Sequence, residues 1–269
     1  DYLKQIGNSQ RIIVVASPNV QTNFKIQLFD ERKLKEVDGI WNLRSCTGTK
    51  YLKEINPMNM KGLTKETVVR QVKRLIETSY VFMGYIEFAN YILNKSRVDD
   101  PDLSEEKRQR IMKRKLVKHF SNRLVIIDEV HNIRITQDNK DKRVANELFK
   151  LAKYVPNLRL LLLSATPLYN SYEEVVWLIN VMNVNDDRPP IRQRDVFNSD
   201  GTFKLDKDGR EVGKELLERK ATGYISFVRG ENPYTFPFRI WPDEFAIKNT
   251  LVDKVYPQSQ LNDKSIERP

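Results

Sequence analysis

Short, continuous apolar runs alternate with amphipathic stretches over residues 11–184 of the chain. Each apolar run contains β-branched or leucine residues and is bounded by polar residues or turn formers, which predicts a buried strand. The expected strands are RIIVVAS at 11–17, YVFM at 80–83, RLVIID at 123–128 and LRLLLL at 158–163. Fully apolar strands separated by amphipathic helices are typical of parallel sheets covered on both faces. The pattern therefore predicts an α/β open parallel sheet, whose ligands bind at the carboxyl ends of the strands.

The stretches between the predicted strands carry apolar residues at helical spacing. Residues 19–37 place Phe24, Leu28 and Leu34 between charged residues, which predicts one helix, whereas residues 45–62 are rich in turn formers and are expected to be loop. The remaining expected helices are 63–79, 85–93, 103–120, 143–155, 171–182 and 214–221.

The composition changes near residue 185, where a polar stretch with Pro189 and Pro190 begins. After it, only the helix at 214–221 and two short β-like pieces, 224–228 and 238–241, are expected. We interpret 1–184 as one partial domain and 185–269 as an extension or linker.

The charge balance favours a polyanionic partner, since 46 Lys and Arg face 36 Asp and Glu and give a net charge of +10. The single cysteine, Cys46, excludes an internal disulfide framework and fits a reducing compartment, so we expect a cytoplasmic protein. No apolar run approaches the roughly 20 residues that span a bilayer, and the first residues lack a signal-peptide core, so we expect no membrane association.

Two adjacent carboxylates, Asp128 and Glu129, follow the predicted strand at 123–128, and His131 comes two places later. Mg²⁺ prefers one or two carboxylates plus water and phosphate oxygens, so this pair could hold the hydration shell of the ion and orient a water. His131 could relay the state of the site, because an imidazole both donates and accepts hydrogen bonds. The simpler alternative is that the carboxylates only cap the helix that follows.

Small hydroxyl residues, Ser164 and Thr166, end the neighbouring strand at 158–163. We expect them to hydrogen-bond the carboxylates of the first strand end and so to couple the two loops, although such residues also end strands for local reasons. Ser171 and Glu174 are interpreted only as a capping box for the next helix.

The motifs together resemble a known family. VIIDEVH at 125–131 and LLLSATPLYNSYEEVVWLIN at 161–180 resemble the Walker B (DExH) and Ser-Ala-Thr motifs of superfamily 2 helicases and Swi/Snf-type translocases. RIIVVASPNVQTNF at 11–24, RSCTGTKYL at 44–52 and YVFMGYIEFANYI at 80–92 are similar to further segments of these motors in the correct order. The segment at 220–242 is similar to helicases and transcription-linked nucleoside triphosphatases of large cytoplasmic DNA viruses.

The resemblance implies a RecA-like first motor domain that binds ATP and Mg²⁺ and moves along DNA or RNA, with viral transcription or replication proteins as partners in a host cytoplasm or virion. Asp128 and Glu129 would handle the metal and the attacking water. His131 would link them to the motif Ser164, Ala165 and Thr166. By the same resemblance, the residues near the phosphates of the bound strand would be Pro18, Asn23, Thr47 and Gly48.

The phosphate-binding loop of this family, G-x-x-x-x-G-K-[ST], is missing. GTK at 48–50 lacks the upstream glycine, and GREVGKE at 209–215 has the wrong spacing. We expect a fragment of a helicase that also lacks the second motor domain and is inactive alone. The alternatives are a non-catalytic nucleic-acid-binding or scaffold module and, less favoured, an unrelated α/β hydrolase, for which His119 would be the only other histidine.

The stretch EEKRQRIMKRKLVKHF at 105–120 is strongly basic. Lysines and arginines dominate non-specific nucleic-acid affinity, but we favour the simpler interpretation of a solvated helix.

Overall fold

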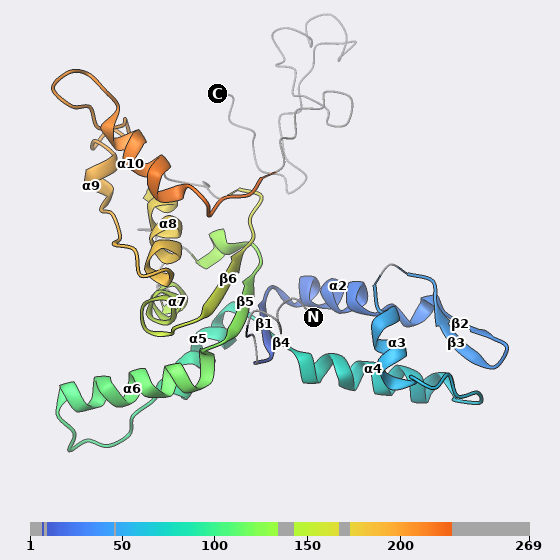
Figure 1. Cartoon of the computed structure of the whole chain (residues 1–269). Helices are drawn as coiled ribbons and strands as arrows, with labels where there is room; N and C mark the ends of the chain where they lie inside the picture. Colours follow the sequence, from blue (N-terminus) through green and yellow to red (C-terminus); the bar gives the residue numbers. More distant parts are fainter. Residues whose placement is uncertain (1–6, 8–9, 46, 134–142, 167–172, 228–269) are drawn as a thin grey trace, which may run out of the picture. The chain divides into compact units, whose positions relative to one another are not determined.

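The computed structural model describes residue 7 and residues 10–45, 47–133, 143–166 and 173–227 (Figure 1). One compact unit spans Asp1–Tyr224, and a second, Ile225–Pro269, has only its first three residues described. The elements are β1 (Ile12–Val15), α2 (Pro18–Leu28), η1 (Glu31–Lys33), β2 (Leu34–Val37), β3 (Ile40–Leu43), α3 (Thr49–Ile55), α4 (Lys65–Ser79), β4 (Tyr80–Met83), α5 (Tyr85–Ser96), α6 (Glu105–Phe120), β5 (Arg123–Ile127), η2 (Val130–Ile133), α7 (Arg143–Tyr154), β6 (Leu158–Leu162), α8 (Glu173–Asn185), α9 (Gln193–Val196) and α10 (Val212–Ala221).

The four predicted strands form one parallel sheet in the order β4-β1-β5-β6 (Figure 1). Val15 of β1 lies beside both Met83 of β4 and Ile127 of β5, and Ile127 lies beside Leu162 of β6. The ends of all four strands therefore meet at one edge, and the predicted α/β open sheet is confirmed.

The main hydrophobic core lies between the sheet and helices α5, α6 and α7, which contact one another. Helix α7 contributes Val144, Leu148 and Leu151, the face that the 3.6-residue period predicts. Burying such side chains is worth about 1.5–3 kcal/mol each, so this packing holds the strand ends in place.

The predicted single helix over residues 19–37 is wrong. Helix α2 ends at Leu28, and the chain then forms the antiparallel hairpin β2–β3. Asp38 and Gly39 at the hairpin turn have φ of 54° and 80°, the left-handed values that a type I′ turn requires. Asp-Gly between two apolar runs is the signal that predicts such a hairpin, and it outweighs the helical spacing of Leu34.

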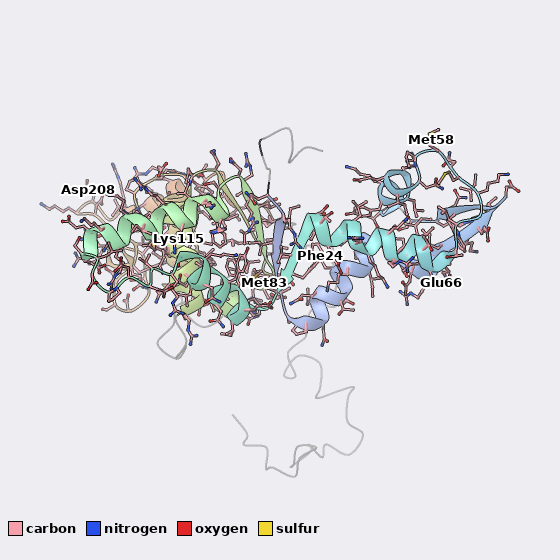
Figure 2. The ribbon with its side chains drawn as sticks, turned by 90° about the horizontal axis from the view of Figure 1, so that it is seen from below. Phe24, Met58, Glu66, Met83, Lys115 and Asp208 are labelled. Atoms are coloured by element: carbon pink, nitrogen blue, oxygen red, sulfur yellow. The ribbon has the colours of Figure 1, made fainter. Side chains whose placement is uncertain are left out.

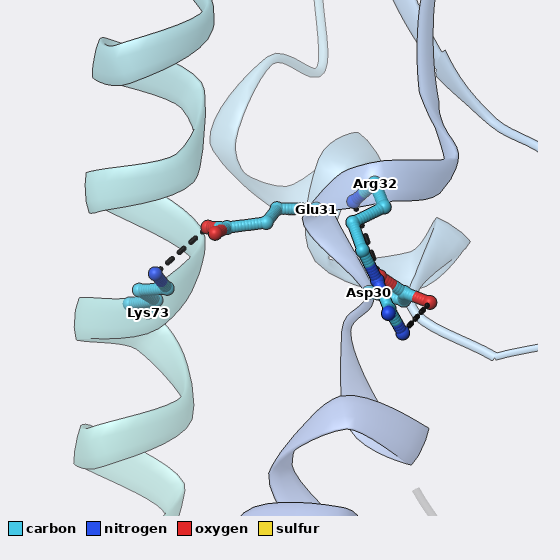
Figure 3. A network of polar contacts seen from close by, with 4 residues as sticks. All are labelled: Asp30, Glu31, Arg32 and Lys73. Atoms are coloured by element: carbon cyan, nitrogen blue, oxygen red, sulfur yellow. Dashed lines mark hydrogen bonds and ion pairs between the residues drawn. The ribbon is translucent and has the colours of Figure 1, made fainter.

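The segment expected to be loop over residues 45–62 contains helix α3, so this prediction is also wrong. Its Leu52 is buried in a second core with residues of β2, β3 and α4. The Trp41 indole N–H of β3 donates to the Leu63 carbonyl oxygen at 2.6 Å. Figure 3 shows a further link, in which Lys73 of α4 pairs with Glu31 of η1 at 2.8 Å.

Residues 186–224 carry α9 and α10, which pack on α8 through a third core. Gly213 in α10 is required there, because a Cβ would lie 2.0 Å from the Val196 carbonyl oxygen. No strand forms over 224–227, and the expected strand at 238–241 and the cap residue Ser171 lie outside the described residues. The domain division at residue 184 stays a prediction.

Within the described ranges, none of the helices is both long and apolar enough to cross a membrane.

Candidate functional site at the carboxyl edge of the sheet

Backbone hydrogen bonds fix the loop that follows β5. The Asp128 N–H donates to the Val15 carbonyl oxygen of β1 at 3.0 Å, and the Leu163 N–H donates to the Ile127 carbonyl oxygen at 2.9 Å. The Val130 N–H donates to the Leu163 carbonyl oxygen at 2.9 Å. The acidic pair is thus clamped between the ends of β1 and β6.

Glu129 has φ of 47°, in the left-handed region that costs a non-glycine residue roughly 1–3 kcal/mol. This conformation turns the chain directly from β5 into η2, and the Asn132 N–H donates to the Glu129 carbonyl oxygen at 2.9 Å. Strain of this kind concentrates at functional sites, so it marks Glu129 beyond its position in the motif.

His131 lies between the two strand ends. Its Nδ1 is 3.1 Å from Glu129 Oε2 and 3.0 Å from Ser164 Oγ, and its side chain is only 17% exposed. Ser164 Oγ also accepts from the Thr166 N–H at 3.1 Å. The expected direct bond from the hydroxyls to the carboxylates is not present among the described residues, because His131 lies between them.

Tyr85, at the start of α5, completes this edge and was missed by the sequence analysis. Its hydroxyl donates to the Asp128 carbonyl oxygen at 3.0 Å and accepts from Asn132 Nδ2 at 3.4 Å. Burial, with Asp128 and Glu129 nearby, raises the pKa of Tyr85, so the phenol stays protonated and keeps donating. The sequence does contain a signal for Tyr85, because this residue follows Gly84 directly after a predicted strand, where site residues of a parallel sheet are expected.

The donor set fits Mg²⁺ held partly by water and phosphate. No cluster of three or more His, Cys, Asp or Glu side chains occurs in the part of the chain that the structure describes, so no closed protein cage is formed there. Mg²⁺ at nucleotide sites takes one or two carboxylates, a number that Asp128 and Glu129 could provide. The backbone N–H cradle for the phosphates has no counterpart in this sequence.

The four residues predicted to lie near nucleic acid fall at the two ends and on the surface of α2. Pro18 is its first residue and follows the end of β1, and Asn23 is exposed on the helix. Thr47 donates through its hydroxyl to the Gln27 carbonyl oxygen near the other end of α2. Pro18 and Leu28, the first and last residues of α2, lie about 15 Å apart at 1.5 Å per residue, and Asn23 lies halfway between them.

The fold itself requires a glycine at position 48. Its φ is 87°, and a Cβ there would lie 2.6 Å from Leu43 Cδ2 and 2.9 Å from the Leu28 carbonyl oxygen. The structure thus brings together Asp128, Glu129, His131 and Ser164, with Ala165 and Thr166 exposed beside them. Gly48 and Thr47 belong to a separate contact with α2.

A parallel sheet with an acidic strand end beside a Ser-Ala-Thr strand end is the layout of a helicase-like motor domain, and comparison with known proteins gives the family. The profile of the SNF2-related domain matches residues 46–220, more than half of the chain. The chain belongs to this SNF2-related family.

The similar proteins come from large DNA viruses. The chain is 26% identical over 210 residues, 72% of its length, to a protein of Acanthamoeba polyphaga mimivirus named "Putative ATP-dependent RNA helicase", of which this covers 17%. It is 26% identical over 156 residues, 55% of the chain and 14% of the relative, to a protein named "Putative helicase" from Invertebrate iridescent virus 3. It is 30% identical over 133 residues, 47% of the chain and 11% of the relative, to the early transcription factor large subunit homolog of African swine fever virus.

The chain therefore spans less than a fifth of the length of these three relatives. No solved structure matches it.

Proposed function

We propose that this chain is part of the first motor domain of an ATP-dependent helicase or translocase that couples ATP hydrolysis to movement on DNA or RNA. The observation that carries the proposal is the contact series Glu129–His131–Ser164, which joins the acidic strand end of β5 to the loop after β6. A pair of carboxylates that only capped a helix would need no such connection.

The residues of this site have separate tasks in the proposed mechanism. When bound, Mg²⁺ would neutralise the negative charge that develops as the phosphoryl group passes from ATP to water. The Asp128 carboxylate would hold the metal through a bound water, and Glu129 would orient the attacking water and accept its proton. Tyr85 and the strand-end hydrogen bonds keep the Asp128 backbone fixed while this happens.

His131 transmits the state of Glu129. His131 Nδ1 is hydrogen-bonded to Ser164 Oγ, whereas Glu129 Oε2 lies 3.1 Å from Nδ1 without a hydrogen bond, so a movement of the carboxylate changes which oxygen a proton on Nδ1 serves. When Glu129 turns toward the water, the hydrogen bond to Ser164 strengthens, and the loop after β6 responds. Nucleic acid is proposed to bind across α2, near Pro18 and Asn23, with Thr47 and Gly48 shaping the far end.

The name of the African swine fever virus relative, an early transcription factor large subunit homolog, supports the proposal of a role in viral transcription. Replication proteins as partners and a host cytoplasm or virion as the location are proposed from the resemblance alone. The chain alone is proposed to be inactive, because its sequence lacks the phosphate-binding loop.

Phosphate release measured on the 269-residue chain and on its complete reading frame tests the proposal. We expect Mg²⁺-dependent hydrolysis, stimulated by nucleic acid, in the complete protein and none in the chain. Turnover by the chain at about 1 s⁻¹ or faster, the lower range of ordinary enzymes, would overturn the statement that it is inactive alone. A complete protein that binds nucleic acid without hydrolysing ATP would favour the non-catalytic module instead.

A further inference from the structure

Helix α6 has two opposite faces. Met112, Leu116 and Phe120 pack into the main core. At 100° per residue, the exposed cations at positions 107, 110, 114 and 118 fall within about 80° of one another and on the side away from that core. We call this set the α6 basic stripe: Lys107, Arg110, Arg114 and Lys118.

The basic stripe is not neutralised by neighbouring acids. Helix α6 holds seven Lys and Arg against two Glu, a net charge of +5 out of +10 for the chain. In the described ranges, no stripe residue pairs with a carboxylate, whereas Glu31 and Asp30 neutralise Lys73 and Arg32 near the hairpin (Figure 3). A run of unpaired like charges is unfavourable for the helix and is relieved by a polyanion.

Cations outside the stripe lie on the same helix and beside it. Arg123, 6% exposed, lies 5.8 Å from the Phe120 ring and donates to Gln10 Oε1 at 3.2 Å. Lys113 of α6 and Lys153 of α7 lie 4.5 and 5.4 Å from the centre of the Tyr154 ring. Figure 2, which shows the molecule from below, labels Lys115 of this helix.

His119 lies on the same helix, close to several of these cations. Burial lowers the pKa of His119, and Lys95, Lys118 and Arg123 lower it further.

The stripe is separate from the candidate motor site. The last turn of α6 leads through Asn122 into the first residue of β5, and so lies at the amino edge of the sheet. Asp128 and Glu129 follow the other end of the same five-residue strand, about 16 Å away at 3.3 Å per residue.

We propose that the α6 basic stripe binds the phosphate backbone of nucleic acid, as a second contact distinct from the one proposed along α2. From Lys107 to Lys118 the stripe is about 16 Å long, along which one strand of a duplex carries about five phosphates. Four long cationic side chains on one face match that spacing without reading sequence.

Fluorescence anisotropy of the 269-residue chain with a labelled DNA duplex tests the proposal. The variant Lys107→Gln, Arg110→Gln, Arg114→Gln, Lys118→Gln should raise the Kd by about tenfold or more at 0.1 M salt. The slope of log K against log salt should become shallower by about 3.6, since each phosphate contact contributes about 0.9. All four side chains are exposed, so the fold should be retained, which circular dichroism checks.

A matched control removes the same charge from exposed cations elsewhere: Lys35→Gln, Lys65→Gln, Lys207→Gln, Arg210→Gln. The control should keep most of the affinity and of the salt slope. Equal losses in both variants, or unchanged binding in the stripe variant with duplex and single strand alike, would overturn the proposal. The latter result would point to an acidic protein as the partner. The assay contains no nucleotide, so its outcome does not depend on the proposed motor activity.

Discussion

The contact between His131 and Ser164 gives a quantitative prediction. Ser164 Oγ lies 3.0 Å from His131 Nδ1 and 3.1 Å from the Thr166 backbone nitrogen. A net hydrogen bond contributes about 0.5–1.5 kcal/mol, and Thr166 is exposed, so most of the loss in Ser164→Ala comes from His131. We expect Ser164→Ala to lower the free energy of unfolding by about 1 kcal/mol, or the Tm by about 2–4 °C.

A double-mutant cycle by urea unfolding isolates the pairwise energy. The loss in His131→Ala with Ser164→Ala should be smaller than the sum of the single losses by about 0.5–1.5 kcal/mol. A matched control pairs His131→Ala with Ser104→Ala, which removes the N-cap of α6 at a similar cost of about 1 kcal/mol. That pair shares no contact and should be additive. Additivity within about 0.3 kcal/mol for His131 and Ser164 would refute the link between the strand ends.

Three further predictions concern the fold. Gly48→Ala should cost about 2–4 kcal/mol, since a left-handed φ is combined with a Cβ that meets Leu43, and chemical unfolding measures it. An NMR titration should find the pKa of His119 below 6.5 and rising toward 6.5 in Lys118→Gln. Because its folded pKa is lowered, its stabilising effect is present above the unfolded pKa and is lost as the pH falls below it. Leu148→Ala, at a fully buried position, should cost about 2–5 kcal/mol in urea unfolding.

Each of these predictions has a matched control. Gly209→Ala shares the positive φ but has no atom within 4 Å of the added Cβ, so it should cost less than Gly48→Ala. Lys65→Gln should leave the pKa of His119 unchanged. Leu205→Ala, at a side chain 58% exposed, should cost under about 0.5 kcal/mol. Equal effects in a variant and its control would contradict the corresponding explanation.

The sheet was predictable because its strands are apolar on both faces. Short apolar runs such as Ile12–Val15 and Leu124–Ile127 are typical of the central strands of a parallel sheet, where both faces are covered. In α7, the helical spacing of Val144, Leu148 and Leu151 predicts the face that is buried in the core. Local pattern and tertiary packing agree at these elements.

The hairpin β2–β3 and helix α3 were not predicted, because helical spacing and turn composition compete with tertiary contacts there. Leu34 fits a helical period, but the Asp38-Gly39 turn reverses the chain, and Leu52 becomes helical while packing on α4. In the site, a parallel sheet already implies that the residues after β5 lie beside those after β6. The contacts of Tyr85 and His131 depend on the directions of their side chains, which the sequence pattern does not give.

The most direct test is ATP hydrolysis by the complete reading frame carrying Glu129→Gln, with Glu211→Gln, an exposed glutamate of the 186–224 segment, as the matched control. The account predicts that Glu129→Gln still binds ATP but loses nucleic-acid-stimulated turnover by about 10²-fold or more, the scale of a missing general base, while Glu211→Gln matches the wild type. Wild-type turnover in Glu129→Gln would contradict it.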